Sequence, residues 1–471
     1  MRARTRRGGP NLLYTHQVID GTEAYFVANK RDVAVEGVCS FRVQGKAPEF
    51  WWPQTGRMER AAVYEEKDGV TRVPLHLDGT ESVFVMFRDA GTIDPVRTVT
   101  LDGERILPAI VKRPKIVVEK ASYGPAGDAA GARDVTDEVQ AIIDGGLTRF
   151  HVGDLDKGGE RTPDIVKRLT MEYTVNGQRH TASGNNSPTD GYWNAELRFQ
   201  NYTANSGDSD EIVLEPDATP AERTADVRVG PDGRIALEAW KNGEYVMETA
   251  SGKTMKTKVT GVGAPEEIRG PWELRFPPNW GAPERVTLDR LKSWSDCSDA
   301  GVRYFSGTAT YRKRFEISKE MMGVGRRLYL DLGDVQVIAE VTVNGKDLGI
   351  LWKPPYSVEV TGAVAAGENT LEVKVTNLWP NRLIGDEQLP EDSERDIGGF
   401  LKDGSPADGT LKAWPQWMLE GKRSPTGRFT FTSWKLWGKD DALLPSGLIG
   451  PVRVREAEKF EVRKSKFEGA E

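Results

Sequence analysis

The segment Asn377–Asp386, NLWPNRLIGD, contains the residue types best suited to hold a polyhydroxylated ligand. Trp379 provides a flat apolar ring, and Asn381, Arg382 and Asp386 provide an amide, a guanidinium and a carboxylate within one short stretch. These polar groups suit bidentate hydrogen bonding to sugar hydroxyls, while the indole offers an apolar platform. We therefore expect this segment to contact carbohydrate. The alternative is that Arg382 and Asp386 pair with each other and hold the loop.

A second aromatic segment, WKPPY at 352–356, joins two extended runs of the chain. Trp352 and Tyr356 could stack against the face of a sugar at the rim of a sheet. Alternatively, Trp352 packs over the end of the sheet, and Pro354 and Pro355 stiffen the connection. Both interpretations stay open at this point.

The stretch from Leu411 to Trp437 contains four tryptophans. Trp414 and Trp417 lie three residues apart, so we expect them to share the buried face of a short helix. The alternation in FTFTSWKLW (429–437) predicts a strand with Trp434 and Trp437 on opposite faces. One of these rings would then be exposed, and Trp434 is our candidate for a further carbohydrate contact.

No metal site or cofactor is predicted. The four histidines form no HExxH motif, and Cys39 and Cys297 are too far apart in sequence for a CxxC pair. Asp154 and Asp156 in GDLDKGG resemble the start of a calcium loop, but a glycine occupies a ligand position and no Glu follows at the twelfth.

The elements that must position these residues are predominantly strands. Short runs alternate apolar and polar residues with a period of two, as in LYLDL at 328–332 and LEVKVT at 371–376, which is typical of antiparallel sandwiches. Asn344-Gly345 and Asn242-Gly243 predict hairpin turns. One helix is predicted around DVTDEVQAIIDGG, with Thr136 as its cap, Val139, Ile142 and Ile143 as its apolar stripe, and Gly145-Gly146 at its end.

Composition limits the classes of function. The chain has 471 residues, enough for about three domains, and its net charge of −7 provides no basic field for a nucleic-acid partner. No apolar run is long enough to span a membrane. The start, MRARTRRGGP, lacks the apolar stretch of a secretory signal, so we expect either a cytoplasmic protein or a missing beginning. Nine of the 13 tryptophans lie between Trp272 and Trp437.

Several of these segments, taken in order, resemble a known module. Five segments resemble the galactose-binding-like jelly roll of family-2-like glycoside hydrolases. In chain order they are GPWELRF, SW at 293–294, GVRYFSGTATYRKRFE, LDLGDVQVIAEVTVNGKDLGILWKPPYSVEVT and GENTLEVKVTNLWPNRLIGD. Three earlier segments resemble the region after the catalytic barrel in family-106-type α-L-rhamnosidases. They are GTEAYFVANK (21–30), GKAPEFWWPQTGRM (45–58) and SVFVMFR (82–88). The segment YGPAGDAAGARDVTDEVQ is similar to a small accessory unit of such enzymes.

The resemblance implies a multi-domain, mainly β protein without a TIM barrel. We expect a β-sandwich at 12–116, a small α+β insert at 117–215, a β segment completing the sandwich at 216–268, a jelly roll at 269–458 and a polar tail at 459–471. In the family, the catalytic carboxylates belong to an upstream barrel, and this sequence lacks the strand–helix alternation of a barrel. Glycoside hydrolysis needs two carboxylates at a fixed separation, and no such pair is assigned here.

The expected function is therefore the non-catalytic, carbohydrate-binding or substrate-positioning portion of an α-L-rhamnosidase-like hydrolase that lacks its catalytic barrel, as a truncated gene product would. A stand-alone carbohydrate-binding protein and a structural sandwich that mediates assembly are the alternatives. The resemblance implies a rhamnose-containing glycan or related plant or bacterial polysaccharide as ligand, and a catalytic domain in a separate or upstream chain as partner. Relatives of this family are commonly exported, so the compartment is left open.

Overall fold

The computed structural model describes twelve segments of the chain, and all structural statements refer to them. They are residues 12–30, 34–89, 93–108, 115–126, 131–144, 149–155, 166–186, 211–213, 224–230, 233–396, 409–435 and 437–461. The described residues form an N-terminal unit, up to residue 235 with 244–257, and a C-terminal unit, made of 236–243 and 258–461. The predicted mainly β, multi-sheet fold is confirmed, and no sheet closes into a barrel among the described strands.

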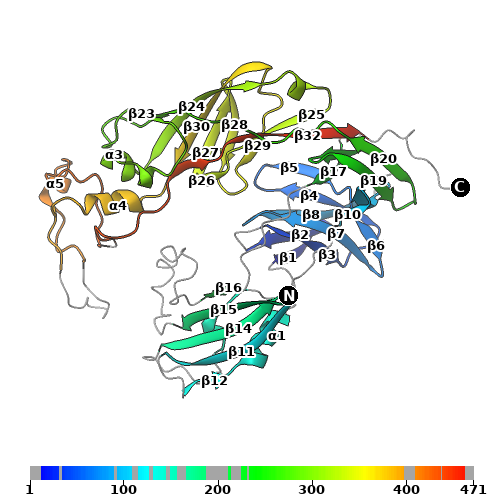
Figure 1. Ribbon diagram of the computed structural model, residues 1–471, viewed down its shortest axis with the longest axis horizontal. Helices are drawn as coiled ribbons and strands as arrows, with labels where there is room; N and C mark the ends of the chain where they lie inside the picture. The colour runs from blue at the N-terminus through cyan, green and yellow to red at the C-terminus, as the bar shows by residue number, and fades with distance from the viewer. Residues whose placement is uncertain are drawn as a thin grey trace. The chain divides into compact units, whose positions relative to one another are not determined.

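The N-terminal unit begins with two antiparallel sheets around a common core (Figure 1). The first sheet has five strands, in the order β1 (Leu12–Ile19), β2 (Thr22–Asn29), β8 (Ser82–Asp89), β4 (Lys46–Trp52) and β5 (Arg57–Arg60). The second has three, in the order β3 (Val35–Phe41), β7 (Val70–Leu77) and β6 (Glu65–Lys67). Alternate residues of both sheets, such as Tyr25, Phe41, Leu75 and Phe87, fill the core, as the period of two predicted.

Further strands of this unit come from distant parts of the sequence. A four-stranded sheet has the order β10 (Glu104–Leu107), β9 (Val96–Leu101), β19 (Gly243–Thr249) and β20 (Thr254–Val259). Strand β17 (Ala225–Val229) reaches the first sheet region through a bridge between Ala61 and Arg228.

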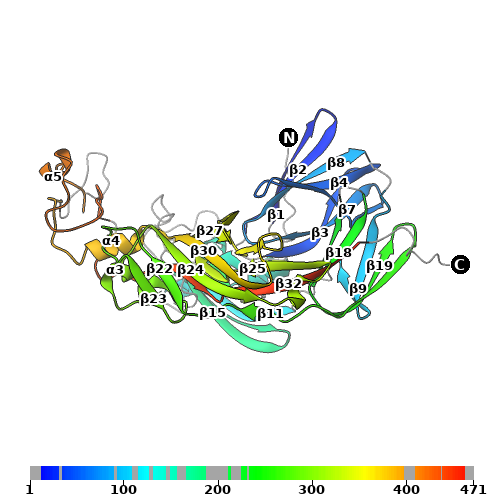
Figure 2. The same cartoon turned by 90° about the horizontal axis from the view of Figure 1, so that it is seen from above.

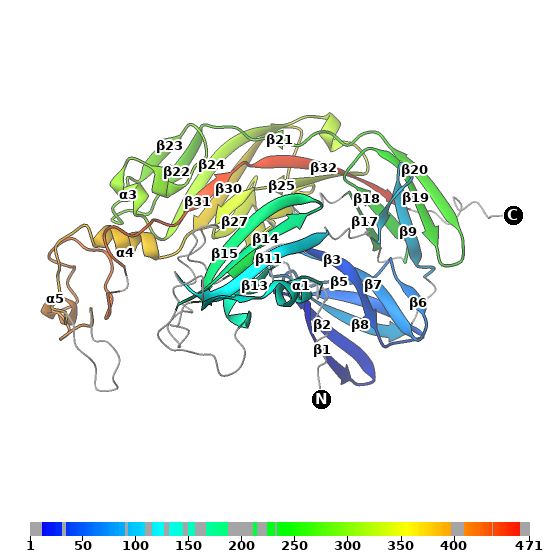
Figure 3. The ribbon, with the colours of Figure 1, turned by 60° about the horizontal axis from the view of Figure 1, so that its bottom comes forward.

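A separate small core forms between residues 116 and 213. Its sheet has the order β12 (Arg133–Asp134), β11 (Ile116–Pro125), β14 (Lys167–Val175) and β15 (Gln178–Asn186), and it is accompanied by β13 (Arg149–His151), a 3₁₀ turn (Val152–Leu155) and β16 (Glu211–Val213). The predicted helix is confirmed as α1 (Thr136–Asp144), which lies along β11 (Figure 3). Its Val139 and Ile143 are buried, and the predicted terminating glycines lie outside the described residues.

The C-terminal unit is a sandwich of two larger sheets. One has six strands, in the order β23 (Arg285–Leu288), β22 (Trp272–Arg275), β24 (Thr308–Ile317), β30 (Gly367–Thr376), β27 (Ile338–Val343) and β28 (Lys346–Leu351). The other contains β18 (Ile235–Ala239), β32 (Arg453–Glu461), β25 (Arg326–Asp331) and β29 (Ser357–Glu359), with β21 (Glu266–Glu267) also paired to β32. A short pair, β26 (Asp334–Gln336) and β31 (Gly447–Gly450), completes the fold.

One continuous core fills the space between these sheets. Leu328 and Leu330 of β25 pack in the same cluster as Val373 of β30 and Val341 of β27. Short helices occupy the connections, and two of them, α3 (Ala300–Arg303) and α4 (Pro380–Asp386), lie at the same end of the sandwich (Figure 2). The others are α5 (Gln416–Leu419) and the 3₁₀ turns Trp294–Asp296 and Glu320–Met322.

The two Asn-Gly pairs have different outcomes. Asn344 and Gly345 both adopt positive φ, at 50° and 77°, and join β27 to β28 in the predicted hairpin. The hairpin predicted at Asn242-Gly243 is wrong, because β18 pairs with β32 and β19 pairs with β9. The Asn242 side chain instead forms two hydrogen bonds with the Val262 backbone. Its Nδ2 donates to the Val262 carbonyl at 2.9 Å, and its Oδ1 accepts from the Val262 nitrogen at 2.9 Å.

The strand predicted at FTFTSWKLW is also wrong. Among the described residues of this stretch, 429–435 and 437, one isolated bridge occurs, between Thr410 and Trp434, and no strand. In the first half of the stretch, side chains bind the backbone groups that a ladder would use: Asp386 accepts from the nitrogens of Phe429 and Thr430, and Arg395 donates to the Thr432 carbonyl at 2.7 Å. Of the described residues here, only those next to Trp434 pair their backbone groups with another segment, the Ser433 carbonyl with the Leu411 nitrogen and the Lys435 nitrogen with the Gly409 carbonyl.

Candidate carbohydrate-binding site

Helix α4 begins where strand β30 leaves the sheet, and its entry is fixed by side-chain hydrogen bonds. Asn377, directly after the strand, donates from Nδ2 to the Phe305 carbonyl at 2.8 Å and accepts from the Gly307 nitrogen at 2.9 Å. Pro380 then occupies the first helical position, where its missing N–H leaves no unpaired donor. This arrangement holds Trp379, the residue before the helix, at the end of the sandwich.

The inner face of α4 is polar and buried. Asn381 is 1% exposed; its Nδ2 donates to the Leu444 carbonyl at 2.7 Å, and its Oδ1 accepts from the Leu444 nitrogen at 2.8 Å. Asp386 is 2% exposed, and its Oδ2 accepts from the nitrogens of Phe429 and Thr430 at 2.9 and 2.7 Å and from the Thr430 hydroxyl at 2.6 Å. These side chains therefore fasten two later segments to the helix.

Arg382 lies between Asp386 and an aromatic ring. Its Nε is 3.1 Å from Asp386 Oδ1, and its guanidinium lies over the Phe429 ring at 4.9 Å from the centroid. Burial lowers the pKa of Arg382, and the neighbouring carboxylate opposes that shift. The geometry favours the alternative that the sequence left open, in which Arg382 and Asp386 pair and hold the loop.

Three aromatic side chains gather beside this buried pair, and we call Trp280, Trp379 and Phe429 the rim cluster. The ring centroid of Trp280 lies 6.5 Å from that of Trp379, in an edge-to-face arrangement, and 6.3 Å from that of Phe429, in a stacked arrangement. The three residues are 37%, 56% and 39% exposed. Apolar rings left in water at a loop end, with their positions set by a rigid polar network beneath, can serve as a platform for the apolar face of a sugar.

The other predicted contact residues are not part of this cluster. Trp352 follows β28 and is 49% exposed, whereas Tyr356 is 6% exposed and donates from its hydroxyl to the Val337 carbonyl at 2.8 Å. Trp434 is half-buried and forms the bridge to Thr410. Of the seven predicted contact residues, only Trp379 belongs to the rim cluster. Sugar contact by the other six stays a prediction; they are Trp352, Tyr356, Trp434 and the buried Asn381, Arg382 and Asp386.

The tryptophans of the predicted short helix are also placed differently from expectation. Helix α5 contains Trp417, which is half-buried and donates from Nε1 to the Asp392 carbonyl at 3.0 Å. Trp414 precedes the helix and is 58% exposed, so its predicted burial is wrong. Pro415 separates the two residues and starts the helix after Trp414.

The segment that supplies Phe429 is tied to the end of α4 by ion pairs. Arg428 Nη1 lies 2.7 Å from Glu387 Oε1, and Lys435 Nζ lies 2.7 Å from oxygens of both Glu387 and Glu391. Arg428 also donates to the carbonyls of Leu389 and Pro390. The rim cluster thus depends on electrostatic contacts as well as on the Asp386 network.

These ion pairs predict a response to acid. Burial raises the pKa of Glu391, but hydrogen bonding from Lys435 and the charges of Arg428, Lys435 and Arg395 outweigh it and lower the pKa below its ordinary value. A lowered folded-state pKa gives stability that is present above the unfolded pKa of about 4.3 and is lost as the pH falls through the folded value. We expect Lys435→Met to raise the pKa of Glu391, measured by NMR titration of its carboxyl carbon. An unchanged titration would contradict the pairing.

The described residues contain no cluster of His, Cys, Asp and Glu side chains able to hold a metal ion, and no helix long and apolar enough to cross a membrane. Asp154 belongs to a 3₁₀ turn, and Asp156 lies outside the described residues.

Two family models match the chain. Residues 3–66 match the model of α-L-rhamnosidase, glycoside hydrolase family 106, and residues 296–399 match that of the galactose-binding domain-like region of glycosyl hydrolase family 2. Both predicted resemblances are confirmed. The second match includes Trp379 and the buried Arg382–Asp386 pair, whereas the segment 82–88 that also suggested a rhamnosidase lies outside the first.

Curated and solved relatives are longer than this chain. A protein of Formosa agariphila, provisionally named a β-glucuronidase, is 32% identical over an alignment of 512 residues, which covers 94% of this chain and 43% of the relative. The rhamnosidase structure from Novosphingobium sp. PP1Y is 24% identical, with a TM-score of 0.48, and the match covers 95% of this chain and 24% of that one. A Bifidobacterium dentium β-glucuronidase is 22% identical over 43% of this chain and 31% of its own, with a TM-score of 0.27.

Sequence reasoning found one member of the rim cluster and missed two. Trp280 follows FPPN, and Phe429 lies in the stretch assigned to a strand, so neither position suggested a binding site. The three rings lie about 50 to 150 residues apart in the sequence, and only the fold brings them together. The available signal was the density of tryptophan after residue 272, which indicated the region but not the residues.

Proposed function

We propose that this chain is the non-catalytic, carbohydrate-binding or substrate-positioning portion of an α-L-rhamnosidase-like glycoside hydrolase. The observation that carries the proposal is the rim cluster of exposed aromatic rings, held on a buried polar network at one end of the sandwich. One of its rings, Trp379, belongs to the segment 296–399, which matches a galactose-binding domain-like model of glycoside hydrolases. A rhamnose-containing glycan is the proposed ligand, because residues 3–66 match a rhamnosidase model.

The absence of a catalytic role is part of the proposal. Asp386, the only carboxylate of the predicted site, is buried and accepts three hydrogen bonds from Phe429 and Thr430. A general acid or nucleophile in glycoside hydrolysis must instead reach the glycosidic bond from a cleft, opposite a second carboxylate. The purified chain is expected to release no aryl product from α-L-rhamnosides or β-D-glucuronides, the substrates that its relatives' names suggest, and turnover that survives purification would contradict this assignment.

Binding is tested with a matched pair of tryptophan variants. Trp379 and Trp414 are 56% and 58% exposed, but only Trp379 belongs to the rim cluster. We expect Trp379→Ala to weaken calorimetric binding of rhamnose-terminated oligosaccharides by about 10-fold or more, equivalent to about 1.4 kcal/mol of lost stacking and apolar contact. Trp414→Ala should leave the affinity within about 2-fold of the original protein, which corresponds to about 0.4 kcal/mol.

A second variant checks that the cluster acts as a unit. Trp280 contacts both other rings, so Trp280→Ala should also weaken binding. If the original protein, Trp379→Ala and Trp280→Ala bound the glycan with equal affinity, the rim cluster would not be the binding surface. Absence of binding to every rhamnose-containing glycan on an array would instead favour the structural sandwich that mediates assembly.

A further inference from the structure

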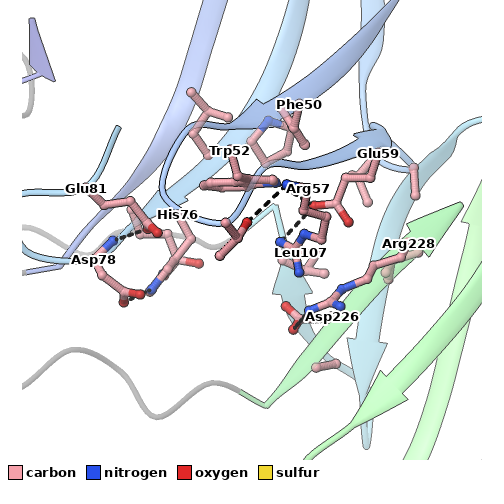
Figure 4. A pocket seen from close by; sticks show the side chains of 18 of the residues that line it. Phe50, Trp52, Arg57, Glu59, His76, Asp78, Glu81, Leu107, Asp226 and Arg228 are labelled. Atoms are coloured by element: carbon pink, nitrogen blue, oxygen red, sulfur yellow. Dashed lines mark hydrogen bonds and ion pairs between the residues drawn. The ribbon is translucent and has the colours of Figure 1, made fainter. Parts of the chain in front are cut away.

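A cleft in the N-terminal unit lies outside the region that suggested sugar binding. It has a volume of about 230 Å³ and lies among strands β3, β4, β5, β7 and β17 and the connections next to them (Figure 4). Pockets that hold drug-sized ligands are usually about 300–1,000 Å³, so this cleft has room for roughly one small ring.

The hairpin of β4 and β5 forms the aromatic wall of the cleft. Phe50 faces Glu59 across the hairpin, and Trp52 faces Arg57, which places all four side chains on one face. The Trp52 indole donates from Nε1 to Glu59 Oε1 at 2.8 Å, and Arg57 donates to the same oxygen at 3.1 Å while lying over the Trp52 ring. Each ring and charge in this wall is therefore held in place by another member of it.

Hydrogen-bonding side chains lie across from this wall. His76 Nε2 is 3.2 Å from Asp78 Oδ1, and the Asp78 nitrogen donates to Glu81 Oε2 at 2.9 Å. On another side, Arg228 donates to Asp226 Oδ2 at 3.3 Å. Figure 4 shows these two groups on different sides of the opening, with Trp52 and Arg57 between them.

The charged side chains that line the cleft favour a neutral ligand over an anionic one. The cleft is lined by five carboxylates but only two guanidinium groups and one imidazole. An anionic ligand such as a uronic acid would be repelled by this excess of negative charge. A neutral sugar would not, and an ionised carboxylate has about four acceptor positions, so the paired acids here keep capacity to accept sugar hydroxyls.

We propose that this cleft is a second carbohydrate site, which binds one neutral monosaccharide unit against Trp52 and Phe50. The carboxylates of Glu59 and Asp226 accept its hydroxyl groups, and Arg57 donates to its oxygens. The proposal does not depend on the rim cluster, because the cleft is lined only by residues of the N-terminal unit.

The test separates the two sites by using a Trp280→Ala/Trp379→Ala background, in which the rim cluster is absent. Ligand-observed NMR titration with L-rhamnose, D-glucose and D-galactose should detect binding of at least one of these sugars to the full chain. D-glucuronate and D-galacturonate should bind at least about 10-fold more weakly than that sugar. No binding of any neutral sugar in this background would overturn the proposal, as would tighter binding of a uronate or of D-glucosamine.

Neighbouring tryptophans provide a matched control. Trp51 lies on the opposite face of β4 and does not line the cleft, while Trp52 does. In the same background, Trp52→Ala should weaken binding about 10-fold or more, and Trp51→Ala should leave it within about 2-fold. Glu59→Gln keeps the shape of the wall and should weaken binding several-fold. This variant keeps the test valid even if Trp52→Ala fails to fold. Equal affinities for Trp51→Ala, Trp52→Ala and Glu59→Gln would place the sugar elsewhere.

Discussion

Replacement of Asp386 by alanine is expected to lower the free energy of unfolding of the C-terminal unit by about 3–5 kcal/mol. The side chain is 2% exposed, holds the backbone of Phe429 and Thr430 and lies 3.1 Å from Arg382 Nε. Its removal would leave the Arg382 guanidinium buried without a counter-charge. Urea unfolding followed by tryptophan fluorescence reports on this unit, because nine of the 13 tryptophans lie between residues 272 and 437.

Two further variants separate the charge effect from general damage to the helix. Gln388→Ala removes an exposed hydrogen bond to the Lys439 carbonyl two residues after Asp386 and should change stability by less than about 1 kcal/mol. Adding Arg382→Met to Asp386→Ala removes the unpaired charge and should restore about 1–3 kcal/mol. Strictly additive losses in the double variant would contradict a coupled Arg382–Asp386 pair.

Trp294→Ala is expected to destabilise the same unit by a similar amount, about 3–5 kcal/mol, because it opens a cavity in the core. Trp294 is fully buried, and its Nε1 donates to the Tyr311 hydroxyl at 2.6 Å. It also packs edge-on against Phe276 and Phe305, with ring centroids 5.7 and 5.5 Å apart. The variant therefore loses apolar contacts and leaves a buried hydroxyl with one partner fewer.

The exposed Trp414 provides the comparison for this cavity. Trp414→Ala removes a side chain of the same size from the surface and should shift the urea midpoint by the equivalent of less than about 1 kcal/mol. Two variants of equal stability would mean that Trp294 does not support the core. A lowered slope of the unfolding transition in Trp294→Ala, rather than a lowered midpoint, would point to a change in cooperativity instead.

The elements that could be predicted from sequence are those whose local pattern and tertiary partners agree. Leu328 and Leu330 alternate in sequence and face one core, and Asn344-Gly345 has the positive φ values that its hairpin needs. Asn242-Gly243 carries the same local signal without forming a hairpin, because the strands on either side pair with distant partners. Turn chemistry permits a hairpin, but strand pairing decides whether one forms.

The candidate site was less predictable for a related reason. The composition of NLWPNRLIGD indicated Trp379 correctly as an exposed ring, but it could not show that Asn381, Arg382 and Asp386 point inward. Their orientation follows from the helix, which turns these positions toward Leu444 and Phe429, more than 40 residues away in sequence. The polar groups that looked suited to sugar hydroxyls bind other parts of the chain, with Asn381 bonded to the Leu444 backbone and Asp386 to the backbone of Phe429 and Thr430.

A crystal structure of the chain with a rhamnose-terminated oligosaccharide would show directly whether the rim cluster binds sugar. We expect a sugar ring packed against Trp379 and Trp280 at the end of the C-terminal unit, with the Arg382–Asp386 contact unchanged beneath it. A ligand that is bound at saturation elsewhere and leaves the rim cluster bare would show that these rings are not the binding surface.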